Sequence, residues 1–171
     1  MKIKIFYLFF FITNILTAQK SVFDIARSGT KEEIKVIHAK HSDTINSKNG
    51  SGFNPLVLAC YRKNNEVASY LAEKVSNINE NSQYGTALMA AVVKDNTEMV
   101  KVLLEQKANP NLQDQNGTTA LHYAVMFQLE DIVKLLVDND AKSNIEDNKG
   151  FTPKDYALKY NNEQINSILK L

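Results

Sequence analysis

Apolar residues recur along most of this chain at intervals of three and four positions, in short runs separated by polar stretches. One such run carries Leu121, Ala124 and Val125. Residues at this spacing share one face of an α-helix, so each run predicts a short helix with one buried face. A second run follows each first one, and its predicted buried face recurs at Met99, Val102 and Leu103, at Ile132, Leu135 and Leu136, and at Ile165, Ile168 and Leu169.

Glycine and asparagine mark the same pattern at a fixed period. Four glycines stand 33, 32 and 33 residues apart, at Gly52, Gly85, Gly117 and Gly150. An asparagine lies six residues before each of them, at Asn46, Asn79, Asn111 and Asn144. A theme that returns at such a period indicates an array of structural repeats rather than one irregular domain.

Each copy predicts two helices that are too small to fold alone. Thr119 is placed to cap the first helix, and Thr86 and Thr152 stand at the same position in their copies. The stretches from asparagine to glycine are polar and rich in turn formers, so they predict hairpin-like loops. Stacking would bury the helix faces in one continuous core, with small residues allowing close approach at Ala59, Ala91, Ala124 and Ala157.

The stretch ANPNLQDQNGTTALHYAVMFQLEDIVKLLVDNDAKSN, with its helix start Thr119-Ala120-Leu121-His122, resembles the ankyrin repeat family. Ala120 replaces the usual proline of that tetrad, which Pro55 and Pro153 retain. The resemblance implies an all-α fold, an ankyrin repeat solenoid of stacked helix-turn-helix units with hairpin-like loops. It covers residues 19–171, with copies at approximately 20–51, 52–84, 85–116, 117–149 and 150–171.

Residues 1–18 are expected to be a signal peptide. Lys2 and Lys4 precede an uncharged apolar run over residues 5–12, and a more polar segment ends at Ala18. The run is much shorter than the roughly 20 residues that span a bilayer, so we expect cleavage after Ala18 and no stable membrane anchor afterwards. The chain is therefore predicted to be exported, to the periplasm or outside the cell.

The net charge argues against a nucleic-acid partner, and the cysteine count excludes an internal disulfide. Hydrophobic residues make up 44% and charged residues 23%, as in soluble folded proteins. Removal of Lys2 and Lys4 leaves 18 of the 20 cationic side chains against 19 acidic ones, a net charge of −1. Nucleic acid is not expected as a partner, because such proteins draw on a strong basic excess. Cys60 is the only cysteine, which rules out an internal disulfide.

Few residues suggest catalysis, metal binding or modification. His38 and His41 lie three apart near Asp43, but a metal site needs more ligands than these, so no metal and no cofactor are expected. The resemblance gives His122 a structural role in hydrogen bonds between repeats. Cys60 is expected to be buried in a first helix. Asn49 and Asn116 each begin an N-glycosylation sequon, and both fall in predicted turns. A turn favours the Asn-Gly pair for its backbone conformation, so glycosylation is not needed to explain it.

The resemblance also places a binding surface. Ankyrin folds usually meet protein partners on a concave face made by hairpin tips and the exposed ends of the first helices. Aromatic, apolar and cationic types favoured at interfaces occupy those helix ends, at Tyr61, Arg62, Val93, Lys94, Met126, Phe127, Lys159 and Tyr160. The hairpins would add a polar rim of Asp114, Gln115, Asn116, Asp147, Asn148 and Lys149, with Tyr84.

The expected function is that of a non-catalytic protein–protein interaction module, exported from the cytoplasm, which binds another protein through its concave face and is monomeric alone. One alternative is a binding subunit that protects or regulates an exported enzyme. A second is an enzyme that uses His38, His41 or His122. A fold alone does not decide among these classes of function.

Overall fold

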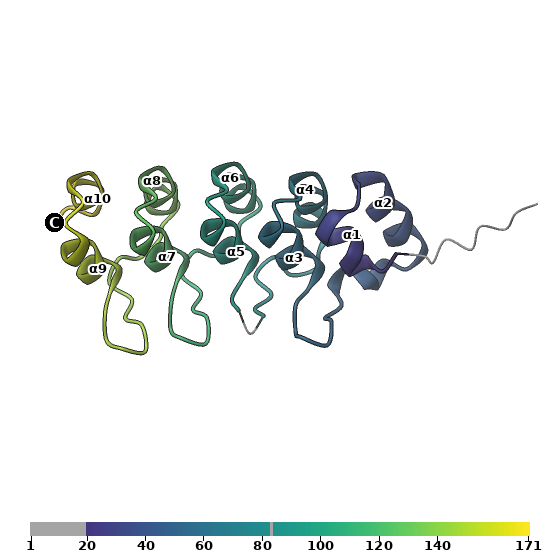
Figure 1. Cartoon of the computed structure of the whole chain (residues 1–171), viewed down its shortest axis with the longest axis horizontal. Coiled ribbons are helices and arrows are strands. Elements are labelled where there is room, and N and C mark those ends of the chain that lie inside the picture. The colour runs from purple at the N-terminus through teal and green to yellow at the C-terminus, as the bar shows by residue number, and fades with distance from the viewer. Residues whose placement is uncertain (1–19, 83) are drawn as a thin grey trace, which may run out of the picture.

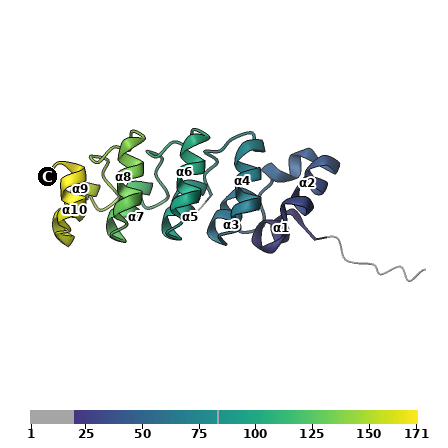
Figure 2. The same cartoon turned by 90° about the horizontal axis from the view of Figure 1, so that it is seen from above.

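The computed structural model describes residues 20–82 and 84–171, and within them the chain is a row of five helix pairs (Figure 1). The pairs stand side by side from α1 and α2 at one end to α9 and α10 at the other, and loops project to one side of the row. A view from above shows the same order (Figure 2). The elements are α1 (Val22–Ser28), α2 (Lys31–Lys40), the 3₁₀ helix η1 (Ser42–Asn46), α3 (Pro55–Tyr61), α4 (Asn65–Lys74), α5 (Ala87–Val93), α6 (Thr97–Glu105), α7 (Ala120–Met126), α8 (Glu130–Asp138), α9 (Pro153–Tyr160) and α10 (Glu163–Leu169).

The predicted all-α repeat architecture is confirmed. Among the described residues β-type pairing is limited to one isolated bridge, between Ser82 and Gly85. The longest of the described helices has ten residues, and none of them is long and apolar enough to cross a membrane. The predicted signal peptide, residues 1–18, lies outside the described residues.

The first helix of each copy begins where its side chains predict. The hydroxyl of Thr119 accepts a hydrogen bond from the backbone N–H of His122, and Thr86 and Thr152 act in the same way in their copies. Asn54 takes this place in the second copy, followed by Pro55 at the first helical position. These caps satisfy N–H groups that a helix leaves without partners, and they fix where each copy starts.

The core lies between neighbouring copies. The four repeated alanines, Ala59, Ala91, Ala124 and Ala157, are all at most 1% exposed, so first helices pack closely. The prediction for the second helices needs one correction. Leu135 is only partly buried, while its neighbour Val133 is fully buried, because α8 packs against both α7 and the adjacent second helices. The same correction applies to Val102, where Val100 is the fully buried residue, and to Ile168, which is partly buried.

The periodic asparagines join one copy to the next. The side-chain oxygen of Asn111 accepts a hydrogen bond from the backbone N–H of Lys142 at 2.7 Å, and its amide donates to the carbonyl of Asp140 at 2.9 Å. Asn46 and Asn79 accept in the same way from backbone N–H groups 30 residues further on. The period of asparagine in the sequence therefore has a structural cause in these bonds.

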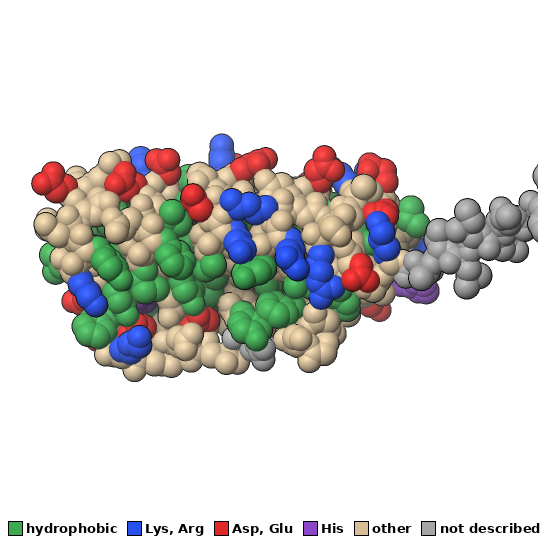
Figure 3. All heavy atoms as spheres, in the orientation of Figure 1, with side chains coloured by type: hydrophobic (Ala, Val, Ile, Leu, Met, Phe, Trp, Pro, Cys, Tyr) green, Lys and Arg blue, Asp and Glu red, His purple; other side chains and the backbone are tan. Residues whose placement is uncertain are grey.

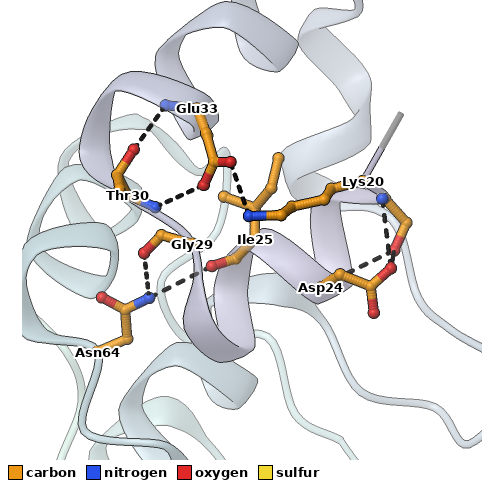
Figure 4. Close-up of polar contacts among 8 residues, drawn as sticks. Lys20, Asp24, Ile25, Gly29, Thr30, Glu33 and Asn64 are labelled. Atoms are coloured by element: carbon orange, nitrogen blue, oxygen red, sulfur yellow. Dashed lines mark hydrogen bonds and ion pairs between the residues drawn. The ribbon is translucent and has the colours of Figure 1, made fainter. Parts of the chain in front are cut away.

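The first copy is fastened at both of its helices (Figure 4). Asp24 and Glu33 complete capping boxes on α1 and α2. Lys20 forms an ion pair with Glu33 at 2.8 Å, and the amide of Asn64 donates to the carbonyl of Gly29 at 2.9 Å. These contacts join Lys20 to α2 and the first copy to the second.

Candidate binding surface

The hairpin loops are held in shape by two aspartates of the predicted rim. One carboxylate oxygen of Asp114 accepts from the backbone N–H groups two and four residues later, and the other accepts from the Tyr123 hydroxyl at 2.6 Å. Asp147 repeats this arrangement with Tyr156 at 2.7 Å. Both aspartates are half-buried. They fasten each loop to the first helix that follows it in the chain, α7 for Asp114 and α9 for Asp147, instead of pointing freely outward.

The pKa values of these groups follow from the contacts. Burial, with the bond to Asp114, raises the pKa of Tyr123 to about 12, and the bond to Asp147 raises that of Tyr156 to about 12. Burial acts to raise the pKa of Asp147, but donation from Tyr156 and two backbone N–H groups outweighs it, so this pKa is lowered. At neutral pH each tyrosine therefore keeps its proton and donates it to its aspartate.

Neighbouring loops are also joined to each other. The backbone N–H and the side-chain amide of Asn148 donate to the carbonyls of Asn116 and Gln115, both at 2.9 Å. Gln115, Asn116 and Asn148 are exposed, as the predicted rim requires, and Lys149 is exposed at the tip of the last loop. At Asn49 the side-chain oxygen accepts from two backbone N–H groups of its own turn.

Above these loops the first helices of three copies enclose an apolar hollow of about 430 Å³. Tyr61, Val93 and Phe127 of the predicted stripe line it, and Tyr84 of the predicted rim closes it on the loop side. Figure 3 shows this gathering of hydrophobic side chains over α3, α5 and α7. The full lining consists of Phe53, Val57, Tyr61, Tyr84, Met89, Ala90, Val93, Tyr123 and Phe127.

The exposed side chains of the hollow are held in place by stacking. The rings of Phe53 and Tyr84 stack with centroids 4.7 Å apart, and Phe127 stacks on Tyr123 at 6.2 Å. Phe127 nevertheless remains 51% exposed, and Tyr61 46%. Large apolar side chains that are ordered but left in water are characteristic of a contact surface.

The rest of the predicted stripe lies outside the hollow. Arg62 is exposed beside Tyr61, and the Lys94 ammonium stands 4.1 Å from the centre of the Tyr61 ring. Met126 is half-buried. On α9, Lys159 is exposed, and the Tyr160 ring stacks on Tyr156 with centroids 6.5 Å apart.

Comparison with known proteins identifies the family. A family model described as ankyrin repeats (3 copies) matches residues 22–114 and 106–170. The chain belongs to the ankyrin repeat family. Ankyrin repeats generally mediate protein–protein interactions, and the family is generally non-catalytic.

The relatives that this chain matches are much longer than the chain, which spans 6–12% of their length. Human BCL-6 corepressor-like protein 1 is 34% identical over 100 residues, which are 58% of this chain and 6% of the relative. Rat ankyrin repeat and SAM domain-containing protein 6 is 34% identical over 107 residues, 61% of this chain and 12% of the relative. An ankyrin repeat protein of Acanthamoeba polyphaga mimivirus is 39% identical over 86 residues, 50% of this chain and 11% of the relative.

The ankyrin motif shows a signal for the hollow that the sequence interpretation missed. His122 occupies the motif's histidine position, and its ring bonds the Phe151 carbonyl of the next copy at 3.1 Å. Val57 and Met89 occupy the same position two copies and one copy earlier, and both line the hollow. An apolar residue cannot form the bond between copies, so this substitution marks where the ankyrin surface becomes apolar.

The other residues considered for catalysis or metal binding are His38, His41 and Cys60. A ring nitrogen of His38 lies 2.8 Å from the Tyr70 hydroxyl, while His41 is exposed at the start of η1. No three metal-binding side chains of the described residues form a group that could hold a metal ion. Cys60 is fully buried in α3, and burial raises the pKa of its thiol to about 12. A thiol that is neither ionised nor accessible is not a nucleophile at neutral pH.

Proposed function

We propose that this chain is an exported, non-catalytic ankyrin repeat protein that binds another protein through the face containing the apolar hollow. The observation that carries the proposal is the hollow itself. It measures about 430 Å³ and is rimmed by Tyr61, Tyr84, Val93 and Phe127, which are between 37% and 59% exposed. Covering such side chains removes apolar surface from water, which favours association.

The ordering of the rim supports the same proposal. Stacking of Phe53 on Tyr84 and of Phe127 on Tyr123 fixes these rings before a partner arrives. Binding then costs less side-chain entropy than it would with freely rotating residues. The bonded loops below the hollow add a polar border of the kind that surrounds the centre of an interface.

The proposal assigns no catalytic role to His122. One ring nitrogen lies within hydrogen-bond distance of Thr119, and the other within that of the Phe151 carbonyl. The side chain is 0% exposed. A histidine with both nitrogens engaged and no access to solvent has no free site for proton transfer to a substrate.

Removal of two rim rings tests the proposed surface. Partners are first identified by crosslinking and pull-down of the mature chain from the extracytoplasmic fraction of its host. The double variant Tyr61→Ala with Phe127→Ala is expected to weaken capture by at least about tenfold, because exposed aromatic anchors carry much of an interface's energy. Its thermal midpoint should stay nearly unchanged, because both rings are about half exposed.

Val36→Ala on α2 is the matched control, since Val36 is an apolar residue of similar exposure, 54%, that does not line the hollow. It should leave capture unchanged. Unfolding of the double variant would place Tyr61 and Phe127 in the core. Unchanged capture by a folded double variant would exclude the hollow as the binding surface.

Export is tested separately. Residues 1–18 carry the charge and hydrophobic pattern of a signal peptide, with the proposed cleavage after Ala18. Mass spectrometry of the native protein should give a mature chain that begins at Gln19, recovered outside the cytoplasm. A cytoplasmic chain that retains residues 1–18 would contradict export without affecting the proposed binding surface.

A further inference from the structure

We infer that the partner presents an extended peptide segment in which a bulky apolar side chain is flanked by aspartate or glutamate. This inference rests on the proposed protein-binding function and specifies the chemistry of the segment. The apolar side chain would occupy the hollow. The acidic residues would meet Arg62 and Lys94 beside it.

The lining of the hollow determines the apolar part of the segment. Its nine residues include no charged side chain, and the polar groups among them are three tyrosine hydroxyls. One of these, on Tyr123, is already bonded to Asp114. A charged group buried there would lose its hydration without gaining an ion pair, whereas an aromatic or aliphatic side chain would gain contacts with Val57 and Met89.

Two cations next to Tyr61 determine the acidic part: Lys94 lies over its ring, and Arg62 follows it in the chain. Arg62 follows Tyr61 directly and is exposed, and the Lys94 ammonium is held 4.1 Å from the centre of the Tyr61 ring. Neither forms an ion pair with any carboxylate in the described part of the chain, including Asp95, which follows Lys94. Figure 3 shows Lys and Arg side chains beside the hydrophobic cluster over α3 and α5.

The position of Lys94 places the site for a carboxylate next to the site for an apolar side chain. An ammonium over the face of Tyr61 is partly fixed by attraction to the ring, so it stands at the border of the hollow instead of sampling solvent. A carboxylate bound there would be adjacent to an apolar side chain packed on the inner side of the same ring. Recognition of both groups at one border favours a short acidic and apolar sequence.

The same charges argue against a second copy of this chain as the occupant. A symmetric dimer through this face would bring two copies of Arg62 and Lys94 into one interface, where the lining of the hollow offers no carboxylate to pair with them. The concave shape of the hollow also fits a narrow protruding segment better than another concave face.

Selection from a phage library of random linear peptides tests the inference. The native chain is expected to enrich peptides that carry an apolar residue next to Asp or Glu. The double variant Arg62→Glu with Lys94→Glu should retain the apolar preference and lose the acidic one. For a selected peptide labelled with fluorescein, anisotropy should show binding about three- to tenfold weaker to this variant, as expected for pairs at an exposed rim.

Lys35→Glu with Lys101→Glu is the matched control, because it makes the same charge change at exposed positions on α2 and α6. It should leave the selection and the affinity unchanged. Raised salt should weaken the peptide's binding to the native chain. It should strengthen the binding to Arg62→Glu with Lys94→Glu, because salt screens the repulsion between the new glutamates and the acidic peptide.

Three results would overturn the inference. Selected peptides without acidic residues, but with binding that Phe127→Ala abolishes, would refute the acidic preference and leave the proposed function standing. Failure to select any peptide that depends on Phe127 would refute both. Dimerisation in sedimentation that Phe127→Ala removes would assign the hollow to a second copy.

Discussion

One position in each first helix decides what lies between neighbouring repeats. In the fourth copy it is His122, whose ring bonds the Phe151 carbonyl of the next copy at 3.1 Å. In the second and third copies it is Val57 and Met89, which form part of the wall of the apolar hollow. The same backbone site therefore supports a hydrogen-bonded seam at one end of the stack and an apolar surface in the middle.

Stability should depend on pH through His122. Burial lowers its pKa below the ordinary 6.5, although the Phe151 carbonyl and the charges of Asp147 and Asp114 act in the opposite direction. The unfolded chain then takes up a proton that the folded chain does not, so the free energy of unfolding falls as pH drops below about 6.5. The slope should reach at most about 1.4 kcal/mol per pH unit.

Urea unfolding of the native chain and of His122→Gln across this pH window checks the prediction. The variant should be less stable at neutral pH and should lack the decline, because glutamine does not titrate. His41→Gln, at an exposed histidine, serves as the control. Carboxylates with a lowered pKa, such as Asp155, add a separate loss only below about their ordinary value of 3.8. An unchanged slope in His122→Gln would assign the decline to other groups.

The resemblance to the ankyrin family predicted part of the candidate site. It placed Tyr61 and Phe127 at exposed ends of first helices, and both are about half exposed there. Phe53 and Tyr123 were missed, because they reach the hollow through contacts with Tyr84 and Asp114 that lie outside the helix pattern. Such contacts depend on the paths of the loops, which a repeat period does not specify.

At the scale of elements, side-chain amides from one loop complete the backbone of the next. Asn46, Asn79 and Asn111 each accept from a backbone N–H group 30 or 31 residues further along the chain. The sequence interpretation assigned these asparagines to turns within their own copies. Their partners are distant in sequence, so the period was visible and its cause was not.

Asn111→Ala is expected to destabilise the fold by about 1–2 kcal/mol, since it removes two hydrogen bonds between copies, to Lys142 and Asp140. Asn144→Ala is the matched control. Asn144 has the same place in its copy, but it is exposed and makes no side-chain hydrogen bond to the described part of the chain. Urea unfolding should show a near-zero effect for Asn144→Ala, and equal losses for both variants would refute a role in joining repeats.

At the scale of the whole molecule, the last repeat differs from the repeats inside the stack. Val125 in the fourth copy is 0% exposed, while Leu158, at the equivalent position in the last copy, is 59% exposed. The sequence pattern did not distinguish Leu158 from its buried equivalents, because an apolar residue at helical spacing looks the same whether or not a neighbour covers it.

Substitution by lysine at these two positions should therefore differ greatly in its effect on the free energy of unfolding. Leu158→Lys replaces an exposed side chain and is expected to change the free energy of unfolding by less than about 0.5 kcal/mol. Val125→Lys would place an unpaired charge in the core, at a cost of several kcal/mol, and should abolish cooperative unfolding. Circular dichroism in urea compares the two variants, and a folded Val125→Lys would contradict the packing of α7.

The buried thiol of Cys60 can report when neighbouring helices of the stack separate. It lies in α3, which packs between α1 and α5, and its pKa of about 12 keeps it protonated at neutral pH. An alkylating reagent can then react only in molecules where α3 has separated from its neighbours. The rate of labelling therefore measures how often α3 separates from α1 or α5, which is an opening of the first three copies.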